Sequence, residues 1–449
     1  MTTVALIIIA VVLFELIIFV HEGGHFLAAK KSGVKVNEFA LGMGPKIFSF
    51  QKGETTYSLR VFPIGGYCAM EGEDEDSENP RSFNNAKIYK RMIIIIAGAF
   101  MNIVLGLVLM MITLLPQEQF ASNTVSSFAP YSYSAVSGLQ PDDEIVNING
   151  YAVNTSTDFS FALYTLPVQE VDGTSLEIYK QDCLFSLYRH YAGIVNDNKD
   201  ISDEDFNESY KLWEEGAKQV REAKDKETAL SVASKSVDDI DTFFNLELSK
   251  DYPVPQNKET RSRFRTDMKV RRNGEIVTLK DVDFVTVKNE GSDKPSLQID
   301  FYVKPIEKTF GTVIGQTFSQ TVSIVRMVWG SLIGIFKGQF GLNDLAGPVG
   351  LASTITDVAS ESLKTSFSSA VMSIVYIMMV ITVNLGVVNM LPFPALDGGR
   401  FLFLLIEGIF RKPIPRKVEA IVNGIGFALL LILMAFISLH DIWKIVVGG

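Results

Sequence analysis

The chain has 449 residues, of which 47% are hydrophobic and only 20% are charged. This balance argues against a soluble or disordered protein. The formal net charge of −10 lacks the basic footprint that binding to a phosphate backbone requires, so nucleic acid is not expected as a partner. The two cysteines, Cys68 and Cys183, are too far apart in sequence for a cysteine-rich metal site. Any bound metal must therefore be held by histidines and carboxylates.

Four apolar stretches, residues 3–20, 92–115, 371–391 and 421–439, are long enough to cross a lipid bilayer as helices. The first stretch could instead be a signal peptide. No lysine or arginine precedes it, however, and His21 and Glu22 stand where a small-residue cleavage site would lie. We therefore interpret it as a retained span. Four spans place both termini on the same side of the membrane.

The basic residues indicate which side that is, because lysine and arginine accumulate in cytoplasmic loops. They cluster at both ends of the loop between the first two spans and again before the last span, whereas residues 116–179 contain none. This distribution predicts a multi-pass protein of the plasma membrane with both termini outside the cytoplasm.

The predicted segments are a first transmembrane helix (1–28), a cytoplasmic loop (29–91), a second transmembrane helix (92–116), an extracytoplasmic domain (117–310), a surface helix and linker (311–370), a third transmembrane helix (371–410), and a basic loop with the fourth transmembrane helix (411–449).

The surface helix is predicted from residues 313–336, where large apolar side chains such as Phe318 and Trp329 share one helical face beside Arg326. Such a pattern is typical of a helix that lies in the membrane surface and contacts lipid. A fifth span is the alternative, which Arg326, Gln316 and Gln320 disfavour.

The extracytoplasmic domain is predicted to be a small α+β domain with a helical insertion. Residues 144–149 alternate as in a strand, and residues 268–270 are expected to pair with 276–279 across Asn273-Gly274, a type I′ hairpin signal. Residues 200–250 are rich in acidic side chains, with aromatic residues at helical spacing and a capping signal at Ser202. We place the insertion at about 175–258.

The cytoplasmic loop carries its own strand signals at residues 37–50 and 56–62. They predict a small β sheet associated with the membrane surface. Gly42 and Gly44 lie within the first strand, where the absence of a side chain would let another backbone approach closely.

His21-Glu22-Gly23-Gly24-His25 is an HExxH sequence at the inner end of the first span. Residues i and i+4 share one face of a helix, so both imidazoles can bind one zinc ion (Zn2+) while Glu22 acts as a base towards water. The alternative is that these residues merely cap the span. A catalytic zinc usually has three protein ligands, so two histidines are not sufficient.

The third span supplies an acidic candidate at the same membrane face. Its inner end, residues 389–399, contains two prolines and two glycines around a single carboxylate, Asp397. Irregular backbone at membrane depth is tolerated where it lines a cavity, so we predict that Asp397 is the third ligand. The alternative is an ordinary capping aspartate. The side-chain amide of Asn389 is placed to hold a substrate carbonyl.

The combination of HExxH, a later N-x-x-P-x-P-x-x-D-G-G and an intervening β domain resembles the bacterial site-2 proteases of the regulator-of-sigma-E type, over almost the whole chain. The residues from Gly138 to Gly150 correspond to part of the PDZ domain of that family. The resemblance implies that His21, His25 and Asp397 bind zinc, that Glu22 is the catalytic base, and that Asn389, Pro392 and Pro394 handle the substrate. It also implies that residues 42–50, which include Gly42 and Gly44, form an edge strand that receives the unwound substrate by β-addition.

The function that follows is intramembrane proteolysis of single-span membrane proteins, such as anti-sigma factors or remnant signal peptides. By family analogy the outer domain would be a size filter that admits substrates already trimmed by another protease. The rival interpretation is a membrane scaffold or peptide-binding protein with a structural, non-catalytic metal site. A transporter is less well supported, because the chain has no internal repeat.

Overall fold

The computed structural model divides the chain into two units, which are described separately. The structure describes residues 2–73, 77–130, 132–172, 174–197, 201–246, 260–288, 295–338, 347–412 and 414–447. The first unit comprises residues Met1–Glu118 and Thr309–Gly449, and the second comprises Gln119–Lys308.

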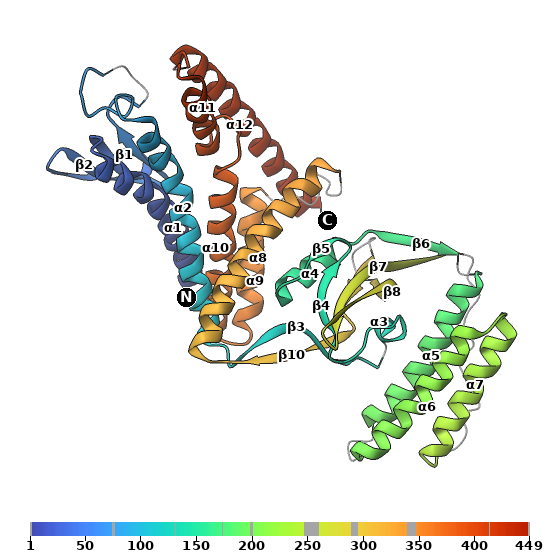
Figure 1. The fold of residues 1–449 in the computed structure, drawn as a ribbon. Coiled ribbons are helices and arrows are strands. Elements are labelled where there is room, and N and C mark those ends of the chain that lie inside the picture. Colours follow the sequence, from blue (N-terminus) through green and yellow to red (C-terminus); the bar gives the residue numbers. More distant parts are fainter. Residues whose placement is uncertain are drawn as a thin grey trace. The chain divides into compact units, whose positions relative to one another are not determined.

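Three helices form the centre of the first unit: α1 (Thr2–Ser32), α2 (Ile88–Leu114) and α10 (Phe367–Asn389), which lie side by side in Figure 1. Glycines let these helices approach closely. A Cβ added at Gly24 of α1 would overlap with the backbone of Ala97 in α2, and one at Gly386 of α10 would lie 3.0 Å from the carbonyl oxygen of Ala99. Small residues at helix contacts are typical of membrane-spanning helices, whose association depends on close packing.

Five helices among the described residues are long and apolar enough to cross a membrane. They are α1, α2, α8 (Phe310–Phe336), α10 and α12 (Arg416–Val447). The chain is therefore a multi-pass membrane protein, but the predicted number of four spans is not confirmed. The additional helix, α8, is the one that we expected in the membrane surface, and it contacts α2 and α10. Two shorter helices complete this unit, α9 (Pro348–Leu363) and α11 (Asp397–Phe410).

The predicted sheet of the loop is present, formed by β1 (Val36–Lys52) and β2 (Thr55–Met70). Residues 38–41 of β1 pair with 66–69 of β2 on one side and with 56–59 on the other, and residues 46–52 pair with 55–60. At the end of the sheet where Met43 pairs with Phe62, apolar side chains are exposed, among them Ile47, Phe48 and Phe62. Pro63 at the same end lines an apolar cavity together with Leu6 and Phe14 of α1. This end of the sheet therefore lies beside the N-terminal half of α1 and exposes an apolar surface there.

The second unit contains an eight-stranded antiparallel sheet with the order β10-β3-β4-β7-β8-β9, in which β5 pairs with β4 and β6 with β7. The strands are β3 (Gln119–Phe128), β4 (Glu144–Ile148), β5 (Tyr151–Ala152), β6 (Val168–Asp172), β7 (Thr260–Arg272), β8 (Glu275–Lys288), β9 (Pro295–Gln298) and β10 (Phe301–Glu307). Two helices, α3 (Tyr133–Val136) and α4 (Ser156–Tyr164), pack with them. The predicted hairpin between β7 and β8 is confirmed: Asn273 and Gly274 have φ angles of 51° and 85°, as a type I′ turn requires.

The predicted helical insertion lies between β6 and β7 and consists of α5 (Leu176–Asp197), α6 (Asp203–Glu222) and α7 (Lys226–Phe243), drawn in green in Figure 1. Trp213, Ala217 and Val220 of α6 are buried in their common core. Ser202 accepts a hydrogen bond from the backbone N–H of Asp205 and caps α6, as expected. Residues 247–259, which include the predicted end of the insertion, lie outside the described residues.

Candidate active site

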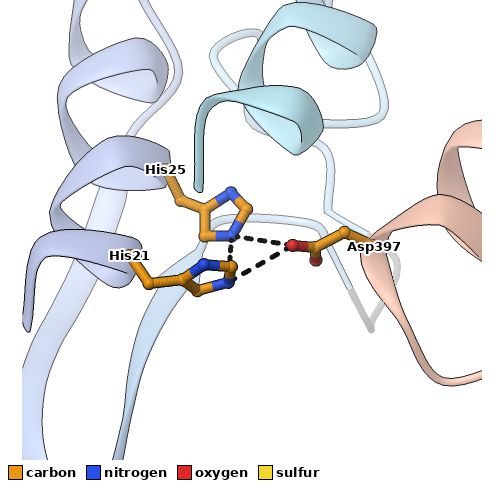
Figure 2. A group of neighbouring side chains, drawn as sticks. All are labelled: His21, His25 and Asp397. Atoms are coloured by element: carbon orange, nitrogen blue, oxygen red, sulfur yellow. Dashed lines mark hydrogen bonds and ion pairs between the residues drawn. The ribbon is translucent and has the colours of Figure 1, made fainter. Parts of the chain in front are cut away.

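His21 and His25 lie on the same face of α1, as the helical spacing predicts. Both are buried, and their Nε2 atoms are 3.3 Å apart (Figure 2). Asp397 approaches them from the start of α11, with its Oδ2 atom 3.3 Å from Nε2 of His21 and 3.4 Å from Nε2 of His25. Residues that are far apart in the sequence therefore present three ligand atoms to one point.

The turn between α10 and α11 places Asp397, and the two glycines after it make that turn possible. A Cβ added at Gly398 would overlap with the backbone of Met390 and Leu391, and one added at Gly399 would overlap with the carbonyl oxygen of Phe393. The first turn of α11 thus packs directly on the preceding backbone. This close contact is the structural reason for the glycine pair after Asp397.

The three ligand atoms fit a zinc ion. Zinc bonds of about 2.0–2.2 Å in tetrahedral geometry separate ligand atoms by about 3.3–3.6 Å. The observed separations of 3.3–3.4 Å match this range. The arrangement also brings two imidazole nitrogens and a carboxylate oxygen together, and a cation stabilises such a cluster of lone pairs. Among the described residues, His21, His25 and Asp397 form the one group of at least three histidine, cysteine or acidic side chains that is suited to a metal.

Groups from α2 orient both imidazoles. Nδ1 of His25 donates to the carbonyl oxygen of Ile94 at 2.9 Å, which leaves the lone pair of Nε2 directed at Asp397. Nδ1 of His21 lies 3.2 Å from the side-chain amide of Asn102, which is fully buried. The oxygen and nitrogen of an asparagine amide have nearly the same shape, so the amide of Asn102 can be turned by 180° in place. In that orientation Oδ1 of Asn102 accepts a hydrogen bond from Nδ1–H of His21. That oxygen has no other hydrogen-bond partner.

Gly98 of α2 is a site residue that we did not identify from the sequence. A Cβ at this position would overlap with Nε2 of His25 and would lie 2.9 Å from Cε1 of His21. Any side chain here would occupy the space of the imidazoles. The signal that could have revealed it is a glycine in the middle of a predicted span, since glycine in a helix interior is costly unless close approach requires it.

Glu22 lies on α1 next to the sheet formed by β1 and β2. A Cβ added at Gly66 of β2 would lie 3.5 Å from Cγ of Glu22 and 3.1 Å from Cγ2 of Ile18. The part of β2 from Gly66 onward therefore borders the helix that carries the expected base. Gly66 was not among our candidate residues, and only its place next to Gly65 in a strand hinted at a backbone contact.

The other candidate residues lie at different distances from the three ligands. The Nδ2 atom of Asn389 is 3.4 Å from Nε2 of His21, so this side chain belongs to the same cluster. Pro392 and Pro394 lie in the turn that leads to Asp397. Gly42 and Gly44 have positive φ angles of 81° and 86°, and side chains added there would meet Phe62 of β2. These two glycines thus shape the sheet.

Comparison with known proteins identifies the family. The sequence model for peptidase family M50 matches residues 9–433. A Clostridium perfringens protein named as a zinc metalloprotease is 30% identical over 438 residues, covering 97% of this chain and 98% of that protein. The Bacillus subtilis protein named regulator of sigma-W protease RasP is 27% identical over 450 residues, 97% of each chain. With three converging zinc-type ligands and these matches, the chain belongs to peptidase family M50, the site-2 type of zinc metalloprotease.

Proposed function

We propose that this zinc metalloprotease cleaves single-span membrane proteins within or near the bilayer. The observation that carries the proposal is the convergence of His21, His25 and Asp397 beside helices long and apolar enough to span a membrane. The Bacillus subtilis relative is named regulator of sigma-W protease. By analogy we propose anti-sigma factors as one substrate class, and remnant signal peptides as another.

The chain's own residues divide the work of peptide hydrolysis. Zinc, when bound, supplies Lewis-acid activation of water and of the scissile carbonyl. Glu22 accepts the proton from the attacking water and passes it to the leaving amine. The amide of Asn389 donates to a substrate carbonyl. Pro392 and Pro394 keep the turn between α10 and α11 non-helical beside the three ligands.

A helical substrate hides its peptide bonds, so it must unwind before hydrolysis. We propose that the extended segment is held along the sheet of β1 and β2 by backbone hydrogen bonds. The family resemblance assigns this role to residues 42–50. The proximity of Gly66 to Glu22 favours the part of β2 that starts at Gly66, because a strand held there lies next to the base.

We propose that both termini and the second unit are extracytoplasmic, as the basic loops suggest. This topology requires that α8 does not cross the bilayer. The contact between Gly347 and Asp441 supports it, since the backbone N–H of Gly347 donates to Oδ2 of Asp441 at 2.9 Å. Asp441 lies roughly 37 Å along α12 from Arg416 in the basic loop. In the proposed topology, with the basic loop in the cytoplasm, Gly347 then lies on the outer side, where α8 also begins. The ten residues between α8 and Gly347 are too few for a second crossing helix.

We propose that the second unit, whose residues 138–150 resemble part of a PDZ domain, acts as a size filter for substrates trimmed by another protease. If so, removing α5 to α7 is expected to allow cleavage of an untrimmed single-span substrate that the native protein leaves intact. The measurement is the ratio of untrimmed to trimmed substrate cleaved by membranes that contain equal amounts of each protein. An unchanged ratio, with trimmed substrate still cleaved, would exclude a filter made by these helices.

The proposed activity is tested with the purified full-length chain and a tagged single-span substrate in lipid vesicles. Cleavage is expected to stop when a chelator removes the metal and to return when zinc is added, because the three ligands bind a catalytic ion. Mass spectrometry of the fragments locates the cut relative to the bilayer. A scaffold with a structural metal would instead retain zinc without cleaving any substrate, and this result would refute the proposal.

A further inference from the structure

We propose that α12 positions the zinc ligand Asp397, with Asn423 as the positioning residue. Asn423 lies on α12, and its Oδ1 atom accepts a hydrogen bond of 3.2 Å from the backbone N–H of Ala395. Ala395 stands two residues before Asp397, in the turn between α10 and α11. This inference rests on the assignment of Asp397 as a ligand, and it adds a residue from a helix that has no role in the site described above.

The turn needs such support because Ala395 has an unfavourable backbone conformation. Its φ angle is 71°, in the left-handed region where a Cβ crowds the following carbonyl group and glycine is normally found. Residues in such conformations persist where the surrounding structure holds them in place. The hydrogen bond from Ala395 to Asn423 is a direct constraint of this kind.

A second contact fixes α12 against the same turn. Gly426 is buried, and a Cβ added there would overlap with Cβ of Pro394 and lie 2.8 Å from its carbonyl oxygen. Gly424, two residues earlier, is exposed and would meet nothing within 4 Å. Gly426 thus permits the close approach that brings Asn423 to Ala395.

Near its C-terminal end, α12 is hydrogen-bonded to the start of α9. The Oδ2 atom of Asp441, a buried side chain, accepts backbone hydrogen bonds of 2.9 Å from Gly347 and 2.8 Å from Gly350 at the start of α9. Helix α12 is therefore held at two separated points, on α9 and on the turn before Asp397. Other parts of its surface are apolar and exposed, including Ile421 and Ile425. The two contacts therefore constrain its position relative to the site.

Asn423 does not need to touch metal or substrate for this effect. The carboxylate of Asp397 must stay within a few tenths of an ångström of its place between the two imidazoles, and small displacements of supporting groups weaken metal sites. Without the hydrogen bond to Asn423 the turn can move, and Asp397 moves with it. The consequence is a weaker and less uniform zinc site.

The test uses Asn423→Ala in the purified full-length protein. We expect its affinity for zinc, measured by competition with a chelator and by metal analysis, to fall about 10-fold. With cobalt in place of zinc, the visible spectrum is expected to lose intensity or broaden, because it reports the geometry of the ligands. The kcat for cleavage should fall while KM changes little, since the substrate is held by other groups.

A second substitution separates positioning from general damage. Ala395→Gly lets the turn adopt its φ angle without a Cβ, so Asn423→Ala combined with Ala395→Gly should recover most of the zinc affinity. The matched pair Gly426→Ala and Gly424→Ala raises helix propensity equally, yet only the first is expected to weaken zinc binding.

The outcomes distinguish this inference from the proposed function. If Asp397→Ala loses zinc but Asn423→Ala and Gly426→Ala bind it as tightly as the native chain, the positioning role is wrong and the ligand set stands. If Asp397→Ala itself keeps full zinc affinity, the ligand assignment is wrong and the inference falls with it. If Asn423→Ala fails to fold, the Gly426→Ala and Gly424→Ala pair decides.

Discussion

Replacing Glu22 by glutamine is expected to reduce peptide cleavage by roughly 10²–10⁴-fold while zinc remains bound, which is the usual effect of removing a general base. Glutamine has almost the same shape as glutamate but cannot accept the proton from water. Glu22 stands next to His21 in the sequence yet is not one of the three clustered ligands, so the metal site should survive. The measurement compares initial cleavage rates and zinc content of the purified native and variant chains.

A matched control for this substitution is Glu361→Gln on α9, an exposed position. It removes the same charge from a residue that does not contact the site, and cleavage should continue at the native rate. Cleavage by Glu22→Gln at that rate would exclude Glu22 as the base. Loss of zinc from Glu22→Gln would show instead that the substitution disturbs the ligands.

The cluster of His21, His25 and Asp397 could be predicted from the sequence because each member has a recognisable signal. His21 and His25 are one helical turn apart, and this spacing alone places both rings on one face. Asp397 stands out as the single carboxylate in a broken segment at the same expected membrane face. The Asn273-Gly274 turn is similarly local, because both residues tolerate positive φ angles and the flanking strands alternate. The histidine spacing and the turn depend on neighbours within a few residues, whereas the assignment of Asp397 also used the predicted order of the spans.

The supporting groups could not be predicted, because their roles arise only where distant segments meet. Asn102 and the carbonyl oxygen of Ile94 orient the imidazoles from α2, and no pattern within α2 indicates which of its faces meets α1. The sequence of α12 gives no reason to single out Asn423, and only the folded structure shows its hydrogen bond to Ala395. The pairing of residues 38–41 with two parts of β2 is likewise a property of the folded sheet.

The number of spans could not be predicted from the sequence for a different physical reason. Helix α8 combines an apolar composition sufficient to cross a membrane with Arg326, Gln316 and Gln320. A hydrophobicity pattern alone does not decide between a surface helix and a span of this kind. Contacts of the segment that follows α8 bear on this question, and the hydrogen bonds from Gly347 and Gly350 to Asp441 of α12 are contacts of this kind.

Gly98→Ala should disable the metal site even though it adds a single methyl group. The new Cβ would overlap with Nε2 of His25, so the ring must turn away and lose its hydrogen bond to Ile94. We expect zinc affinity to fall at least 10–100-fold, as when other groups that orient zinc ligands are changed, with a comparable or larger loss of cleavage. Alanine favours a helix more than glycine does, so weakening of α2 itself would not explain the loss.

The measurement for Gly98→Ala is the zinc content of the purified protein after dialysis against a graded chelator, together with its cleavage rate in vesicles. Gly424→Ala serves as the control, because it makes the same change in a helix where the Cβ meets nothing within 4 Å. An excess of zinc should restore part of the activity if the defect is weaker binding alone. Native zinc affinity in Gly98→Ala would mean that α1 and α2 can separate at this level, and the close packing at Gly24 would then no longer define the position of the histidines.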